Sequence, residues 1–161
     1  MHEQKNQFSV CIQQDPFDLF ALQQSLLSGE HQEGAVATFT GYVRNNNDDR
    51  SVSSLELEHY PGMTEKCIED ILLEAGRRWP ISAGIVVHRV GLLAPGDPIV
   101  WVGIASGHRG AAFSACEYVM DYLKTRAPFW KKEVGEHGAS WVDARESDHA
   151  KASSWTNSDD N

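Results

Sequence analysis

The chain has 161 residues, which is room for one hydrophobic core of ordinary size and requires no second domain. Its 23 Asp and Glu outnumber 14 Lys and Arg, and the formal net charge of −9 argues against nucleic acid or an anionic membrane as a general partner. No apolar run approaches the roughly 18 residues of a membrane span. The three cysteines are far apart and form no C-x-x-C pair, so we expect a cytoplasmic protein without disulfides.

Residues 1–33 are polar and weakly patterned, and we expect them to form a peripheral N-terminal segment. A short helix is expected within "DPFDLFALQQSLL", where four apolar side chains are loosely spaced for one face: Phe17, Phe20, Leu22 and Leu26. The stretch "GAVATFTGYV" at 34–43 predicts a strand. Its alternate positions would share one side: Ala35, Ala37, Phe39 and Val43. The polar run "RNNNDDR" then predicts a loop.

Residues 52–60, "VSSLELEHY", alternate apolar and polar side chains as a half-buried strand does. After the turn "PGM", a helix is predicted from Thr64 as its N-cap to Pro80, which stops it. Its buried positions are expected at helical spacing: Ile68, Ile71, Leu72, Ala75 and Trp79. The stretches "GIVVHRVGLL" and "PIVWVGIAS" predict two strands that form a hairpin through "APGD".

A second long helix is predicted over 110–126, because Pro128 disfavours helical geometry at the residue before it. Its buried stripe would consist of Ala112, Ala115 or Cys116, Val119 and Leu123. "SWVDARE" predicts a short late strand, and residues 149–161 a flexible polar tail. Strands before, between and after two main helices favour an α+β domain over regularly alternating βαβ units.

Two groups of cations flank the second long helix. His108 and Arg109 stand at its start, where unpaired backbone N–H groups favour an anion. "KTRAPFWKK" at its end holds four cationic residues in nine. Lys124 follows Met120 by one helical turn and should lie at the edge of the core. Pro128 can redirect the chain so that Lys131 and Lys132 return toward the same region.

Each signal also has an ordinary structural interpretation. Lysines after a helix are often solvated residues that favour the helix dipole, Arg44 could be a surface charge, and Met120 could be core packing. His59 and His88 are better read as structural residues than as ligands, because no second ligand sits at metal spacing. The sequence lacks G-x-S-x-G, a P-loop, G-x-G-x-x-G and H-E-x-x-H, so no metal or resident cofactor is expected and an enzymatic nucleophile would come from elsewhere.

Several ordered blocks together resemble the large, catalytic subunit of molybdopterin synthase, the MoaE family. They are "GAVATFTGYVRN", "LELEHYPGMTEK", "GHRGAAF", "MDYLKTRAPFWKKE" and "WVDARESD", and they define an expected domain at 34–148. The resemblance implies an α/β-hammerhead-like fold with a mixed or antiparallel sheet. It also implies a sulfurtransferase that converts cyclic pyranopterin monophosphate to molybdopterin, with two sulfurs from the C-terminal Gly-Gly thiocarboxylate of a small ubiquitin-like subunit.

By the same resemblance, Lys124 is similar to the family's essential catalytic lysine and Lys131 to a second important one. Lys132 and Glu133 would line substrate in the same loop. The arginine after the first strand would be Arg44, reached through Tyr42 and Val43, although some relatives carry a lysine where Tyr42 stands. Pocket-wall positions would be Phe39 and Met120, and the phosphate side His108 and Arg109. Arg145 is a candidate for reaching a neighbouring subunit's site.

The implied assembly is a homodimer of large subunits within a heterotetramer that carries two small subunits. Two other functions stay open at this point. One is a non-catalytic scaffold that grips a ubiquitin-like Gly-Gly tail. The other is a hydrolase that uses Cys116 with His108, although a cysteine on a buried helical stripe is a poor nucleophile.

Overall fold

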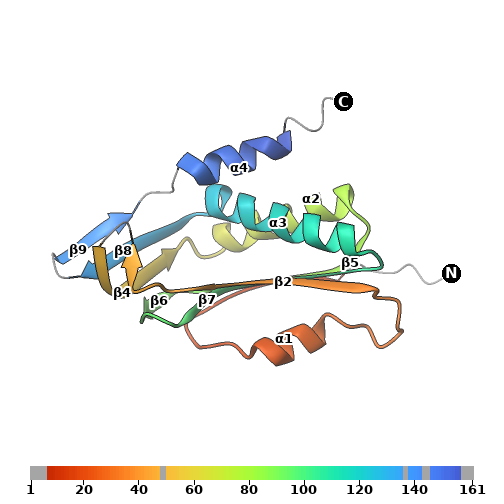
Figure 1. Ribbon diagram of the computed structural model, residues 1–161, viewed down its shortest axis with the longest axis horizontal. Coiled ribbons are helices and arrows are strands. Elements are labelled where there is room, and N and C mark those ends of the chain that lie inside the picture. The colour runs from red at the N-terminus through yellow and green to blue at the C-terminus, as the bar shows by residue number, and fades with distance from the viewer. Residues whose placement is uncertain (1–6, 48–49, 136–137, 143–145, 157–161) are drawn as a thin grey trace.

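Two β-sheets and four helices make up the described part of this computed structural model, which comprises residues 7–47, 50–135, 138–142 and 146–156 (Figure 1). The strands are β1 (Gln7–Gln13), β2 (Ala35–Tyr42), β3 (Asn46–Asn47), β4 (Arg50–His59), β5 (Ile81–Arg89), β6 (Gly91–Leu93), β7 (Pro98–Ser106), β8 (Phe129–Gly135) and β9 (Gly138–Val142). The helices are α1 (Leu19–Ser25), α2 (Met63–Arg78), α3 (Arg109–Arg126) and α4 (Glu146–Thr156). The predicted α+β class is confirmed, and α2 and α3 are the two main helices.

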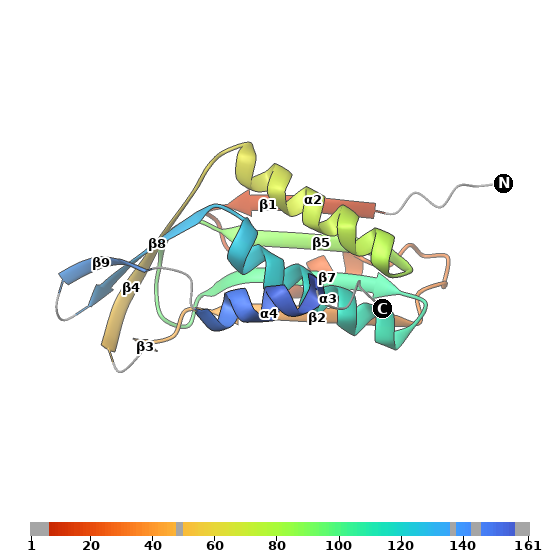
Figure 2. The same ribbon diagram turned by 90° about the horizontal axis from the view of Figure 1, so that it is seen from above.

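The larger sheet has the strand order β1-β5-β7-β2 and is mixed, since β1 runs parallel to β5 while the other pairs are antiparallel. Helices α2 and α3 cover one face and α1 lies on the other (Figures 1 and 2). The predicted pairing of the strands on either side of "APGD" is confirmed, because β5 and β7 pair along most of their length. Between them β6 leaves this sheet and pairs with β4.

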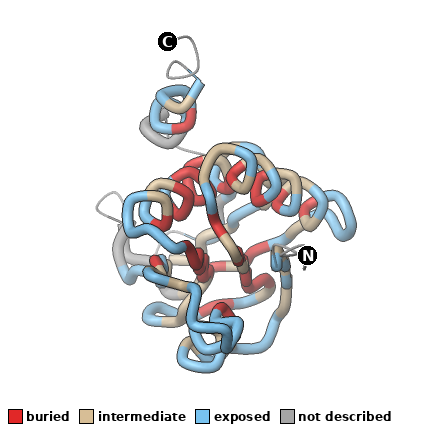
Figure 3. Tube along the Cα trace, turned by 90° about the vertical axis from the view of Figure 1, so that its right-hand side faces the viewer, coloured by how far each residue is buried: buried red, intermediate tan, exposed pale blue. Residues whose placement is uncertain are grey.

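The core lies between the helix pair and the larger sheet, where buried positions gather in Figure 3. The expected stripes of both helices are confirmed at most positions: Ile68, Ile71, Leu72 and Ala75 on α2, and Ala112, Ala115, Cys116, Val119 and Leu123 on α3 are all buried. Trp79, also expected on the α2 stripe, is the C-cap residue and is only partly buried. The buried stripes pack on Val86, Val102 and Ile104 of the sheet, each 0% exposed. Truncating one of the large aliphatic residues to Ala should therefore cost about 2–5 kcal/mol.

The smaller sheet has the order β3-β4-β8-β9, with β6 on β4. The strand predicted at 52–60 is confirmed as β4, and its alternate residues Leu55 and Leu57 are 7% and 1% exposed. Strand β8 was not predicted: Lys131, Lys132 and Glu133, expected in a loop, lie on a strand paired with β4. Apolar periodicity is weak in "FWKKEVG". The strand there depends on pairing with β4 and β9, which are distant or later segments of the chain.

Both chain ends contain regular structure that the sequence pattern did not predict. The polar N-terminal segment contains strand β1, which forms an edge of the larger sheet. Leu26, the C-cap of α1, is buried against Trp101. Phe20, expected on the same helix face, is 74% exposed. At the other end, residues 149–156 belong to α4 rather than to a flexible tail, and Trp155 donates from Nε1 to Asp121 Oδ2 at 2.8 Å.

Two smaller boundaries differ as well. Thr64, expected as the N-cap of α2, lies inside its first turn, and Gly62 takes the cap position with a φ of 85° that favours glycine. The late strand ends at Val142, and Glu146 already belongs to α4. In the described residues, no helix is long and apolar enough to cross a membrane.

Candidate functional site

The four cations of "KTRAPFWKK" have different surroundings in the structure. Arg126 is bound to α2 through Nη1 and Glu74 Oε2 at 2.6 Å, and this hydrogen bond holds the pKa of Glu74 below its usual value. Lys132 Nζ lies 5.8 Å from the ring centroid of Trp141, a cation–π distance. Arg126 and Lys132 thus each contact a neighbouring element, and Lys124 and Lys131 are the two residues of the stretch for which the sequence implies a chemical role.

Lys124 lies in the last turn of α3 with an exposed side chain. One turn earlier Met120 is 8% exposed and belongs to the main core, so the predicted position of Lys124 at the core's edge is confirmed. The helix ends as expected, because Ala127 before Pro128 takes the extended conformation with φ −78° and ψ 128°. A cation in this turn is stabilised by the carbonyl end of the helix.

The bend at Pro128 is held by the first turn of α2. Thr64 is 0% exposed, and its Oγ1 donates to the Pro128 carbonyl at 3.0 Å and accepts from the Tyr60 N–H at 2.9 Å. The next residue, Phe129, pairs with His59 in the β4–β8 ladder. The stretches "EHYPGMT" and "KTRAPFWKK", 64 residues apart between Thr64 and Pro128, therefore meet at one buried hydroxyl.

Strand β8 sends its side chains to two faces. Directly opposite residues of an antiparallel pair share a face, so Lys131 lies with Leu57 and Lys132 with Glu56. Leu57 belongs to the buried side of the smaller sheet, together with Val43 and Leu93. Lys131 and Glu133 thus stand on the inner side, and Lys132 on the outer side. Lys131 and Lys132, expected in the same region, therefore present their side chains to opposite faces of β8.

His88 is a buried histidine close enough to Lys131 for the lysine's charge to affect its pKa. The ring of His88 is 5% exposed and stacks on Phe129 with centroids 4.0 Å apart. Its Nδ1 is 2.8 Å from the Arg89 carbonyl, which can only accept, so Nδ1 carries the proton. Burial lowers the pKa of His88 to about 4, with smaller contributions from the positive charges of Lys131 and His59. His88 is therefore neutral near pH 7.

The end of β2 reaches the same side of the molecule. The row Gly41, Val100 and His88 crosses three neighbouring strands. Val43 is buried in the cluster that contains Leu57, and Arg44 follows it with an exposed side chain. On the same strand Phe39 is 40% exposed and its ring lies beside Gly41, while Tyr42 is 51% exposed. Arg44, Lys124 and Lys131 thus come from three elements that end or begin where the two sheets meet.

His108 and Arg109 lie far from that junction. Both are exposed at the start of α3, where the His108 N–H donates to Ser106 Oγ at 3.1 Å. Fifteen residues separate Arg109 from Lys124 on one helix, a rise of about 22 Å. Figure 2 shows the helix running from this start, near the far end of β7, toward β8. One copy of the chain does not bring both cation groups together.

Some residues of this junction gave little sequence signal. Thr64 was expected as a helix cap and His88 as an ordinary structural histidine, because nothing in the sequence shows which distant segments they contact. Arg145 lies outside the described residues. Cys116 is buried at 7% exposure, and burial, followed by the nearby Glu117, raises its pKa to about 11, which disfavours the thiolate that a hydrolase would need. Among the described residues no His, Cys, Asp and Glu cluster could hold a metal ion.

Comparison with known proteins identifies the family. The model of the MoaE protein family matches residues 12–126. The molybdopterin synthase catalytic subunit of Pseudomonas aeruginosa is 53% identical over 147 residues, covering 91% of this chain and 98% of that protein. The Escherichia coli K12 subunit of the same name is 56% identical over 129 residues, covering 80% and 86%. The molybdopterin biosynthesis MoaE protein from Burkholderia ambifaria is 52% identical in sequence, with a TM-score of 0.79 over 92% of this chain and 97% of that one. The chain belongs to the MoaE family of molybdopterin synthase catalytic subunits, which act in molybdenum cofactor biosynthesis.

Proposed function

We propose that this chain transfers two sulfurs to cyclic pyranopterin monophosphate and so forms molybdopterin. The sulfur donor is the C-terminal Gly-Gly thiocarboxylate of a small ubiquitin-like subunit. The observation that supports this most directly is the Thr64-held bend at Pro128, since it joins the end of α3, with Lys124, to the inner face of β8, with Lys131. A sulfur carried in by a partner also accounts for a chain whose buried Cys116 is a poor nucleophile.

Electrostatics explains why several cations are needed. The pterin phosphate and the thiocarboxylate are both anions, and they must approach each other in a partly desolvated site. Arg44, in the segment after β2, and Lys131, on β8, bind and offset these charges. Fixed cations of this kind also stabilise negative charge that develops during each transfer.

Lys124 is the catalytic residue of the proposal. Lying one helical turn after the buried Met120, it acts at the carbon under attack as an acid or base, as a stabilising charge or as a transient covalent link. In each transfer the sulfur forms a bond to a pterin carbon while a carbon–oxygen bond at that carbon breaks, the oxygen leaving as water or staying on the phosphate. Water then breaks the bond between the sulfur and the acyl carbon of the tail. The tail is left as a carboxylate and the pterin carries the sulfur.

The remaining positions of the site shape it. Phe39 and Met120 form apolar wall, while Tyr42 and Val43 present Arg44, and Glu133 follows Lys131 on the same face of β8. Lys132 lies on the opposite face of the sheet, over Trp141, and we leave it out of the substrate contacts of its own chain.

The assembly proposed is a homodimer of this chain within a heterotetramer with two small subunits. Because about 22 Å of helix separates Arg109 from Lys124, a phosphate held at His108 and Arg109 could serve the Lys124 site only if the two ends came from different copies. A twofold dimer offers this arrangement twice, once at each site.

The decisive experiment mixes the purified protein with cyclic pyranopterin monophosphate and a thiocarboxylated small subunit. Dithiolene formation is followed by mass spectrometry for the wild type, Lys124→Ala and Lys66→Ala. Lys66 is an exposed lysine of α2 whose Nζ lies 3.7 Å from Asp70, and it serves as the matched control. Product from the wild type and Lys66→Ala but not from Lys124→Ala supports the proposal. No product from any of them, with the small subunit still bound, would favour the scaffold function instead.

A further inference from the structure

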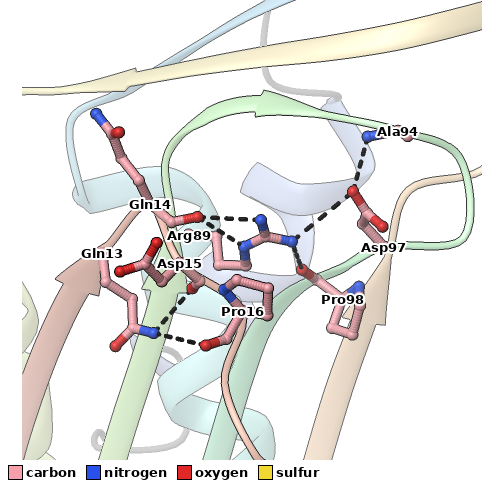
Figure 4. A network of polar contacts seen from close by, with 8 residues as sticks. All are labelled: Gln13, Gln14, Asp15, Pro16, Arg89, Ala94, Asp97 and Pro98. Atoms are coloured by element: carbon pink, nitrogen blue, oxygen red, sulfur yellow. Dashed lines mark hydrogen bonds and ion pairs between the residues drawn. The ribbon is translucent and has the colours of Figure 1, made fainter.

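A buried arginine joins two turns at the junction of the sheets (Figure 4). Arg89 ends β5 and is 8% exposed. Its Nε and Nη2 donate to the Gln14 carbonyl at 3.1 and 3.0 Å, and its Nη1 donates to the Pro98 carbonyl at 3.4 Å. A buried guanidinium is tolerated when such bonds replace its hydration. Arg89 therefore ties the segment after β1 to the start of β7.

The same guanidinium faces the turn that precedes β7. Its Nη1 lies 3.8 Å from Asp97 Oδ2, and this oxygen also accepts the Ala94 N–H at 2.9 Å. The Asp97 N–H donates back to the Ala94 carbonyl at 3.0 Å. The turn from Ala94 to Asp97 is thus closed by hydrogen bonds between these two residues, and its contact with Arg89 fixes its position.

The backbone of this turn holds the residue before Arg44. The Val43 N–H donates to the Asp97 carbonyl at 2.9 Å, and the Gly96 N–H donates to the Val43 carbonyl at 2.7 Å. The register of β2 on β7 shifts between Gly41 and Tyr42. The two hydrogen bonds of Val43 therefore lie just beyond the regular β2–β7 ladder. They fix the backbone at the point where the chain leaves the sheet and continues to Arg44.

We propose that Arg89 is a positioning residue for Arg44: it locates the turn at 94–97, and that turn holds Val43. The inference rests on the proposed function, in which Arg44 contacts the anionic substrate. Small displacements of Arg44 would matter, because a substrate-binding group moved by about 1 Å can lower a rate by up to about 100-fold. Arg89 itself makes no substrate contact in this scheme.

The first test asks whether Arg89 acts through Arg44. Arg89→Lys keeps the charge but loses the planar fork, and we expect it to raise KM for cyclic pyranopterin monophosphate about tenfold with little change in kcat. In an Arg44→Ala background the same substitution should change KM by less than about twofold, because the residue being positioned is gone. Independent, multiplicative effects of the two substitutions would overturn the inference.

The second test does not depend on activity. Amide hydrogen exchange of Val43 and Gly96 should be faster in Arg89→Lys, whereas amides at the centre of β5 and β7 keep their protection. Unchanged exchange at Val43 and Gly96 would overturn the inference. If the wild type forms no product, the proposed function fails, and this measurement still decides whether Arg89 holds Val43.

Two further variants separate positioning from general stability. Asp97→Asn keeps an oxygen for the Ala94 N–H and removes the charge that faces Arg89, so it should reproduce both effects if Arg89→Lys does not fold. Arg78→Lys is the matched control, since Arg78 also donates to a backbone carbonyl, that of Trp155 at 3.4 Å, but between α2 and α4. It should leave KM and Val43 exchange at wild-type values, and a KM increase equal to that of Arg89→Lys would contradict a specific role.

Discussion

Lys131 and Lys132 are adjacent in sequence but lie on opposite faces of the smaller sheet. Lys131, itself exposed, pairs with the buried Leu57, and its charge contributes to the low pKa of His88. Lys132 pairs with Glu56 and Trp141 on the outer side, where Nζ approaches the Trp141 ring. The strand alternation that separates them makes the two lysines a natural pair for comparison.

Lys131→Ala should reduce product formation at least about tenfold, because a cation that offsets substrate charge is lost. Lys132→Ala should stay within about twofold of the wild type, since the half-buried Lys132 contacts Trp141 on the outer face through a cation–π contact. The measurement is the initial rate of dithiolene formation over a range of pterin concentrations. Equal losses in the two variants would contradict the assignment of the inner face to the site.

Thr64 should couple stability to activity through the bend at Pro128. Thr64→Val keeps the shape of the side chain but leaves the Tyr60 N–H and the Pro128 carbonyl without their partner, which should cost about 1–3 kcal/mol. Thr64→Ser keeps the hydroxyl and loses only a methyl, about 1 kcal/mol. Urea unfolding measures the stabilities, and rates are compared well below both midpoints. We expect the valine variant to be slower than the serine variant; identical rates would mean that the bend needs no hydroxyl.

His88 should make stability depend on pH in a defined window. The unfolded chain takes up a proton near the ordinary pKa of 6.5, but burial keeps the folded ring neutral down to about pH 4. The stability linked to His88 is therefore complete above 6.5 and is lost as the pH falls toward 4, by on the order of 3 kcal/mol.

Urea unfolding at about pH 7.5 and about pH 5 checks this window. His88→Phe keeps an aromatic ring against Phe129 and removes the titration, so its loss of stability between the two pH values should be smaller than that of the wild type. His149→Gln, which removes an exposed imidazole from α4, should keep the wild-type loss. A loss in His88→Phe as large as in the wild type would place the acid sensitivity elsewhere.

Local pattern was sufficient to predict the parts of the fold that carry their own periodicity. The stripes of α2 and α3 follow from apolar residues such as Ile68, Ile71 and Val119 at helical spacing, and β4 follows from Leu55 and Leu57 at alternate positions. Strand β8 has no such pattern. Its strand geometry comes from pairing with β4 and β9 on either side, which no window of the sequence reveals.

The site shows the same division. Lys124 could be placed at the end of a helix from spacing and from Pro128, and the structure agrees. The positions of Lys131 and Lys132 required the register of β8. The distance from Arg109 to Lys124, by contrast, follows from the single helix predicted over 110–126. Thr64 and Arg89 reach residues 64 and 75 positions away, so their contacts could be found only in the folded chain.

Mixing two inactive variants should restore activity if each site draws on two copies. Lys124→Ala and Arg109→Ala would each inactivate both sites of their own homodimer. In a mixed dimer, one site has lost both residues and the other has both intact, so about a quarter of all sites should recover after full subunit exchange. The rate of dithiolene formation is measured before and after the exchange, with Lys124→Ala mixed with Lys131→Ala as control, because these residues belong to the same end of one chain. Recovery in the control but not in the test pair, or recovery in neither, would assign Arg109 to a role outside the Lys124 site.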